Sequence, residues 1–147
     1  MRAKLIHDGT EKTWAVIFRH GDEVVEGLKD FARRQELAGS HFTAIGAFSE
    51  VTLAYFNWES KQYIQIPVRE QVEVLSLVGD IALKPDGSPE VHAHAVVGRS
   101  DGTTLGGHLM AGHVRPTLEV MLVESPRHLQ RKQDPESGLA LIDLDAF

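Results

Sequence analysis

The chain has 147 residues, of which 42% are hydrophobic and 24% charged, and it carries a net charge of −6 and no cysteine. This length suits one domain with a sizeable core, and the lack of cysteine excludes disulfides and thiolate metal sites. An acidic chain repels phosphate backbones, which disfavours unaided nucleic-acid binding. No apolar run approaches the roughly 20 residues of a membrane span, and residues 1–12 lack a signal-peptide core. We therefore expect a single domain, residues 1–147, in the cytoplasm.

A strand and the principal helix open the predicted fold. Residues 13–20 alternate in polarity and predict a buried strand. Residues 21–40 place apolar side chains at helical spacing and predict the helix, with one face toward the core. Asp22 is suited to cap its start, and Gly39 is suited to end it in a left-handed conformation.

A strand at 41–48 and a β-hairpin at 51–68 follow, with the hairpin turn near residues 59–61. The hairpin is rich in aromatic residues, for which core packing is the expected use and a ligand-stacking patch the alternative. These residues are Tyr55, Phe56, Trp58 and Tyr63.

Residues 71–83 predict a strand that is apolar on both faces. One face would carry Leu75, Leu77, Ile81 and Leu83, and the other Val72, Val74 and Val78. Such a strand is expected to be covered on both sides. A single helix covers only one face of a sheet, so we expect subunit association to cover the other.

The remaining elements are strands joined by short turns. Strands are expected at 91–98 and 117–124, with a further segment at 103–112 and a polar tail from 126 to 147. The tail is expected to be loop up to residue 137, with a short strand at 139–144. The predicted class is α+β, with about seven mainly antiparallel strands, one principal helix and a core spanning about residues 12–125.

Two histidines lie on one face of the strand "VHAHAVVG", residues 91–98. Because side chains alternate along a strand, His92 and His94 point together, away from the core. The turn "SDG" suits a three-residue hairpin loop that places Arg99 opposite Thr103. In that register His94 lies opposite His108, with Cβ atoms about 4.5–5.5 Å apart.

His92, His94 and His108 are therefore the predicted metal ligands. Three histidines with an open position are a recurrent zinc arrangement, although imidazole also suits iron, nickel and copper. A two-residue turn, or a bulge at Gly106–Gly107, would move His108 to the opposite face. The alternative is that the histidines are only polar surface or serve subunit packing.

Other polar residues offer weaker candidates. His113 could be a further ligand or a proton carrier, while the other histidines suit surface or capping roles: His7, His20, His41 and His128. The carboxylates that could assist a metal are Glu73, Asp80, Glu90 and Glu119. The chain contains neither a G-x-S-x-G elbow nor a glycine-rich phosphate loop.

Several segments in order resemble the plant and prokaryote conserved (PPC) domain. They are "GDEVVEGLKDFA", "FTAIGAF", "VTLAYFNWESKQY", "EVLSLVGDIAL", "PEVHAHAVVGRSDGTTLGGHLMAG" and "RPTLEV", and they cover about residues 12–125. The resemblance, to a stand-alone prokaryotic member, implies a β-sheet with one helix against it and a homotrimer. It also implies a metal ion, zinc by preference, on His92, His94 and His108.

The resemblance further suggests a DNA-binding, transcription-regulatory role. This chain lacks the Arg-Gly-Arg-Pro hook with which the plant proteins bind DNA, and the basic residues of "RHLQRK" at 127–132 are too few to offset its acidic surface. The alternative function is a metal-dependent enzyme that acts on a small molecule through the three histidines.

Overall fold

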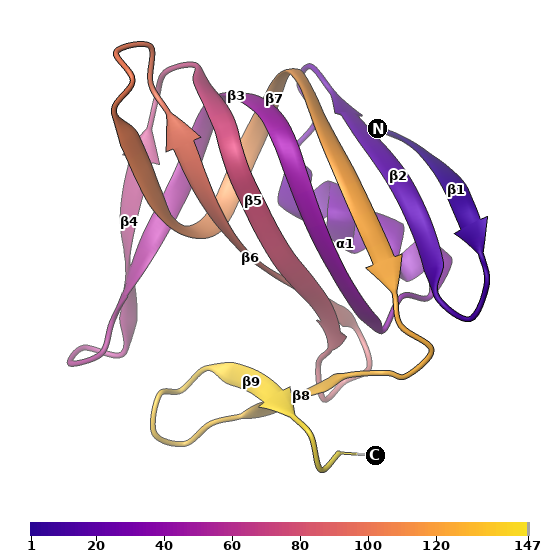
Figure 1. Ribbon diagram of the computed structural model, residues 1–147. Coiled ribbons are helices and arrows are strands. Elements are labelled where there is room, and N and C mark those ends of the chain that lie inside the picture. The colour runs from indigo at the N-terminus through magenta and orange to yellow at the C-terminus, as the bar shows by residue number, and fades with distance from the viewer. Residues whose placement is uncertain (147) are drawn as a thin grey trace.

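The computed structural model describes residues 1–146, in which one sheet packs against one helix (Figure 1). The helix α1 spans Val24–Gln35. The strands are β1 Arg2–Asp8, β2 Lys12–Arg19, β3 Gly39–Asn57, β4 Gln62–Val68, β5 Val72–Leu83, β6 Pro89–Gly98, β7 Thr104–Glu124, β8 Gln130–Gln133 and β9 Ala140–Asp143. The α+β class with a mostly antiparallel sheet is confirmed.

The sheet curls because four of its strands close on themselves. Both β5 and β7 pair with β3, and both also pair with β6. On one side the sheet extends from β7 through β2 to β1, and on the other side it extends from β5 through β8 to β9. The first half of β7 thus lies between β6 and β3, and this position decides where His108 points.

Two strands are longer than predicted. The expected strands at 41–48 and 51–57 are one strand, β3, and the segments 103–112 and 117–124 are both part of β7. Register shifts in the β3–β7 pairing let these strands bend without ending. The short strands β1 and β8 were not predicted, because β1 is almost wholly exposed and β8 lies in a polar segment.

The helix is shorter than the predicted range 21–40, and both predicted caps are wrong. Glu23 is the N-cap, and its carboxylate accepts hydrogen bonds from the backbone of Val25 and Glu26. Asp22 instead accepts a bond from Arg19 N and pairs with the N-terminal amine. At the other end, Glu36 adopts the left-handed conformation with φ of 54°. Gly39 already begins β3.

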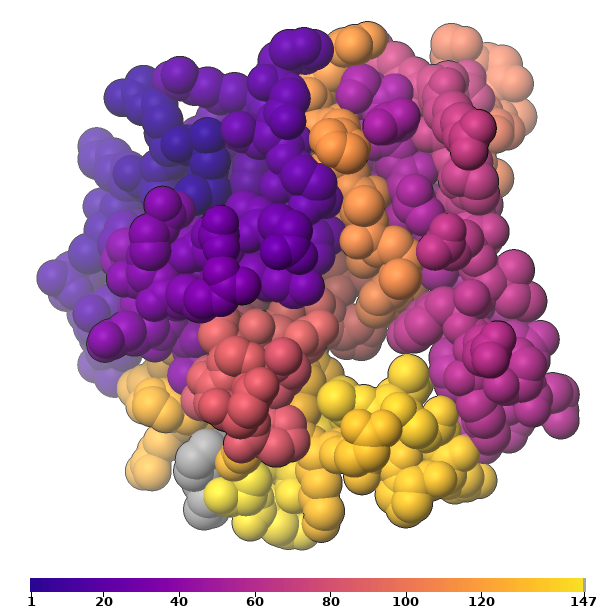
Figure 2. Space-filling model, turned by 180° about the vertical axis from the view of Figure 1, so that it is seen from behind, coloured from indigo at the N-terminus to yellow at the C-terminus, as the bar shows by residue number. Residues whose placement is uncertain are grey.

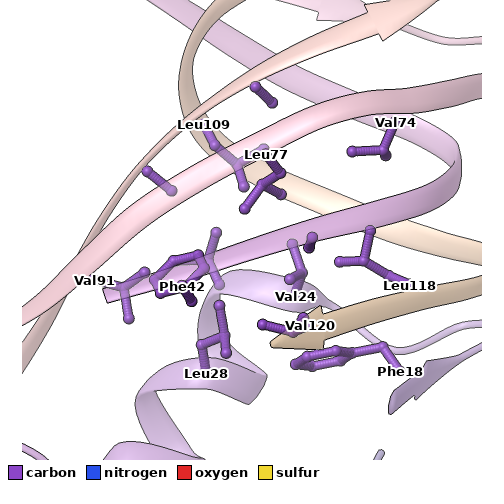
Figure 3. Close-up of a cluster of buried hydrophobic side chains, with 14 of the residues drawn as sticks. Phe18, Val24, Leu28, Phe42, Val74, Leu77, Val91, Leu109, Leu118 and Val120 are labelled. Atoms are coloured by element: carbon purple, nitrogen blue, oxygen red, sulfur yellow. The ribbon is translucent and has the colours of Figure 1, made fainter. Parts of the chain in front are cut away.

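The helix buries its apolar side chains against one face of the sheet, and the two sets of side chains together form the core (Figure 3). Phe18, Val24 and Leu28 meet Phe42 and Leu118 there, and all five are almost fully buried. This burial fixes which face of each strand is internal. The opposite faces of β5 and β6 are left for other uses.

The predicted division of the apolar residues of β5 between its two faces is wrong. A bulge between Val74 and Ser76 shifts the alternation. Val74, Leu77 and Ile81 are consequently buried, whereas Leu75 and Val78 are 53% and 48% exposed. The sequence pattern hides this bulge because both faces are apolar.

The tail forms a hairpin against the end of β5 (Figure 1). Leu83 N donates to Leu129 O, and Leu129 N donates to Ala38 O, each at 2.8 Å. The predicted short strand near 139–144 is present as β9. Residue 147 of the predicted tail lies outside the described residues. Within residues 1–146, no helix is both long and apolar enough to cross a membrane.

Candidate metal centre

The turn between β6 and β7 sets the register of the histidines. Arg99 N donates to Thr103 O at 2.8 Å, and Gly102 has φ of +84°, as a three-residue loop requires. The carboxylate of Asp101 accepts bonds from the amide and the hydroxyl of Thr103 and stiffens this loop. His94 consequently lies opposite His108, which confirms the predicted register.

The three histidine rings meet on the outer face of β6 and β7. One potential ligand nitrogen from each of His92, His94 and His108 lies within 4.8 Å of the others. The ring centroids are 5.1–5.5 Å apart. Zn–N bonds of about 2.0–2.1 Å would place the nitrogens roughly 3.4 Å apart, a contraction within the reach of side-chain rotation.

The surroundings keep two of these rings neutral near pH 7. Burial, and then the neighbouring His92 and His94, lower the pKa of His108 to about 4. Burial and His92 also lower the pKa of His94 below its usual value. A neutral imidazole offers a lone pair to a metal ion, whereas a protonated one does not.

One ligand residue has a buried nitrogen without a hydrogen-bond partner, which also fits a bound metal ion. Nδ1 of His108 is buried and has no hydrogen-bond partner among residues 1–146. An unpaired buried nitrogen costs free energy, which pairing with a ligand would recover. The residues present therefore fit a divalent ion.

Asp80 on β5 lies beside the cluster and contacts one of its histidines. One of its carboxylate oxygens lies 3.6 Å from Nδ1 of His92, and the other contacts Arg131 Nη2. Burial raises the pKa of Asp80, but His92 and the guanidinium of Arg131 outweigh this and hold that pKa below its usual range. A carboxylate beside a histidine orients the ring for a metal.

Arg131 contacts Asp80 beside the candidate site, and no sequence pattern singled it out. It lies on β8 and is only 5% exposed, yet its contact Asp80 is 51 positions away in the chain. It belongs to a tail expected to be loop, so no local pattern marks it. Of the four candidate carboxylates, Asp80 contacts the cluster and Glu90 lines the hollow beside it.

The hairpin aromatics lie outside the buried core, and one of them lies beside the candidate site. The ring of Tyr63 lies 4.7 Å from that of His108, beside the candidate site. Core packing is wrong for Tyr55 and Trp58, which are 63% and 49% exposed. The ammonium of Lys61 instead lies over the ring of Trp58, with Nζ 3.2 Å from the ring centre.

His113 does not join the cluster. Its Nδ1 lies 3.4 Å from Glu50 Oε1, and it sits five residues along β7 from His108, roughly 16 Å at strand spacing. It therefore serves as a matched surface histidine for the experiments below.

The metal-free protein is expected to lose stability as pH falls from about 6.5 to about 4. The unfolded chain protonates His108 near its ordinary pKa of about 6.5, whereas the folded chain does so only near 4. The free energy of unfolding therefore decreases across this window and is unaffected above it. Urea unfolding in EDTA at pH 7, 6, 5 and 4.5 measures this.

A His108→Gln variant supplies the control, because it removes this titration and should flatten the decrease. The lowered pKa of Asp80 acts only below about pH 4, where its stabilisation is lost, so the two effects separate. Equal pH dependence of the two proteins would contradict the assignment.

The fold and the site together define an α+β domain whose mostly antiparallel sheet presents three clustered histidines on one face. The chain belongs to the Plants and Prokaryotes Conserved (PCC) domain family, whose sequence model matches residues 7–126. The resemblance noted from the sequence is thereby confirmed.

Solved structures of similar proteins agree with this assignment. A plant- and prokaryote-conserved protein from Pyrococcus horikoshii is 31% identical, with a TM-score of 0.83 over 97% of this chain and 94% of that one. A metal-containing protein from Archaeoglobus fulgidus is 30% identical, with a TM-score of 0.83 over 89% and 92%. A candidate DNA-binding protein from Ralstonia eutropha is 32% identical, with a TM-score of 0.83 over 89% and 90%.

A curated relative places similar sequence in a larger protein. The chain is 31% identical over 140 residues to the bifunctional protein GlmU of a Synechococcus strain. The match takes in 93% of this chain but only 21% of that protein, so the chain spans about a fifth of its length.

Proposed function

We propose that this domain is a metal-binding module in which His92, His94 and His108 hold one divalent ion, zinc by preference. The observation that carries the proposal is the convergence of three imidazole nitrogens within 4.8 Å. Three nitrogen donors suit zinc, and the similar Archaeoglobus fulgidus protein is described as metal-containing.

Three neutral imidazoles leave the full positive charge of the ion in place. A bound zinc ion would supply Lewis acidity at its open position. The protein's own part is to hold the rings: Asp80 faces His92, and Tyr63 covers one face of His108. Such support keeps the donors in place when the site is empty.

We further propose that the domain assembles as a homotrimer through the sheet face opposite the helix. Large apolar side chains are exposed there on four neighbouring strands, and monomers rarely expose large contiguous apolar patches. They are Ile45, Leu75, Val78, Val96 and Met121. Covering them would also account for the apolar outer face of β5.

Metal analysis and solution mass of the purified protein and of His92→Ala test both proposals. We expect about one metal ion per chain in the parent and a loss of bound metal in the variant, while both keep a threefold mass. Metal retained by His92→Ala contradicts the site, and a monomeric parent contradicts the assembly.

A metal-dependent enzyme acting on a small molecule is the second candidate. The observation that favours it is a hollow of about 210 Å³ lined by His92 and His108. Substrate sites need such a recess beside the reactive group. Turnover that requires the metal and disappears in His94→Ala would establish this function.

A DNA-binding role has support only from relatives described as candidate DNA-binding proteins. The net charge of −6 opposes contact with phosphate backbones. A gel-shift titration at low salt decides this role, because binding without sequence-specific contacts should appear there and weaken steeply with added salt.

Asp80→Asn is expected to weaken zinc binding by about tenfold or more, because the amide orients His92 less strongly than the carboxylate. Competition with a chromogenic chelator measures the affinity. Asp86→Asn is the matched control, since Asp86 lies in the turn after β5 and contacts Lys84 and Ser88. Unchanged affinity in Asp80→Asn contradicts the supporting role.

A further inference from the structure

We propose that the hollow beside the histidine cluster binds a small organic carboxylate between the metal ion and Arg131. This inference rests on the proposed metal centre and names the class of ligand that the centre would take. Tyr63, His92, His108 and Arg131 line the hollow, which has a volume of about 210 Å³. In the sequence they are dispersed over β4, β6, β7 and β8.

The C-terminal hairpin forms the opposite wall. Leu139, Ala140 and Leu141 line the hollow together with His92 and His108. Figure 2 shows the hairpin, in yellow, and the β3–β4 hairpin, in magenta, with a recess between them. The same hairpin carries Arg131. The hollow therefore has the histidine nitrogens on one wall and, on the other, one guanidinium among apolar side chains, as expected of a site for a small molecule with few polar groups.

Arg131 is the residue that selects an anion. It is 5% exposed, and two of its nitrogens are already engaged: Nη2 by Asp80 and Nη1 by the carbonyl of Ala140 at 3.0 Å. Its Nε has no hydrogen-bond partner among residues 1–146. The one unused donor, Nε, can bond a single carboxylate oxygen, and a hydrogen bond between two charged groups is stronger than one to a neutral acceptor.

The balance of charge around the hollow points the same way. A divalent ion and Arg131 would contribute three positive charges, against two negative charges from Asp80 and Glu90. The surplus favours a negatively charged ligand. A carboxylate oxygen on the open metal position and contact with Arg131 would satisfy both groups at once.

Size limits the ligand to a few heavy atoms. The volume corresponds to about seven water molecules at about 30 Å³ each, which accommodates a short organic acid but no nucleotide or folded peptide. The apolar wall suits a short alkyl group on the acid.

The test uses pyruvate as the probe and the cobalt-loaded protein, whose visible spectrum reports ligands at the metal. With each protein loaded to one cobalt ion per chain, we expect pyruvate to bind the parent at least tenfold more tightly than it binds Arg131→Gln, with Arg131→Lys between them. We also expect pyruvamide, the uncharged analogue, to bind the parent at least tenfold more weakly than pyruvate. Arg127→Gln, on the exposed part of the same tail, is the control and should bind as the parent does.

Equal pyruvate affinity in the parent and both Arg131 variants overturns the inference, because the metal alone would then bind the acid. If circular dichroism shows that Arg131→Gln is unfolded, Arg131→Lys and the pyruvamide comparison decide. A parent without stoichiometric metal defeats the proposed function separately. Pyruvate shifts in NMR spectra of the metal-free protein would then support the Arg131 site if the Arg131 variants lose them, and their absence overturns it.

Discussion

Saturating zinc is expected to raise the free energy of unfolding of this domain by about 2.7 kcal/mol when free zinc is one hundred times its dissociation constant. The gain arises because the folded chain brings three imidazole nitrogens within 4.8 Å of one another, while the unfolded chain leaves them 2 and 14 residues apart along a flexible backbone. His94→Ala should abolish most of the gain. Urea unfolding at pH 7 in EDTA and in buffered zinc measures it.

His94 suits this experiment because its side chain is exposed in the single chain, and the comparison in EDTA separates loss of zinc binding from any change in the stability of the metal-free protein. His113→Ala is the matched control, an exposed histidine of the same sheet outside the cluster, and it should keep the full response. Equal zinc stabilisation in the parent and His94→Ala would show that the ion binds elsewhere. No zinc effect on the parent would leave the cluster without a metal.

Gly107→Ala is expected to destabilise the metal-free protein by about 1–3 kcal/mol, the usual cost of forcing extra volume into packed structure. A Cβ atom at residue 107 would lie 2.6 Å from the carbonyl oxygen of Ala54, too close to be relieved without moving backbone. Because Ala54 pairs with His108, the shift should also weaken zinc binding. Urea unfolding in EDTA, followed by chelator competition, measures both effects.

The neighbouring Gly106 gives an internal control. A Cβ atom there would meet Ala95 O at 3.4 Å, an ordinary van der Waals contact. Gly106→Ala should therefore be neutral or slightly stabilising, because alanine loses less backbone entropy on folding than glycine. Similar stabilities of the two variants would contradict the close approach of β3 to β7.

Two features of the candidate site followed from local sequence. The alternation in residues 91–98 decided that His92 and His94 share a face, because successive side chains of a strand point to opposite sides. The "SDG" turn then decided the partner of His94, because a three-residue loop with left-handed Gly102 permits one register. Both constraints act over a few residues and need no knowledge of the rest of the fold.

Features that depend on competition between neighbours could not be predicted in this way. Glu23 rather than Asp22 caps the helix, and Asp22 instead pairs with the N-terminal amine, which directly precedes the unpredicted strand β1. The side chains of β5 that face the core change parity at a bulge, and the sequence of a strand that is apolar on both faces gives no sign of it. In each case the deciding partner is distant in sequence.

By itself the sequence determined the class of fold, the single helix and the three histidines on one sheet face, because periodicity and turn chemistry are local properties of the backbone. Only the tertiary structure decided what surrounds those histidines. It closed β3, β5, β6 and β7 on one another and folded the tail so that Arg131 reaches Asp80. Such contacts depend on where chain segments far apart in sequence meet, and burial of the shared core determines that position.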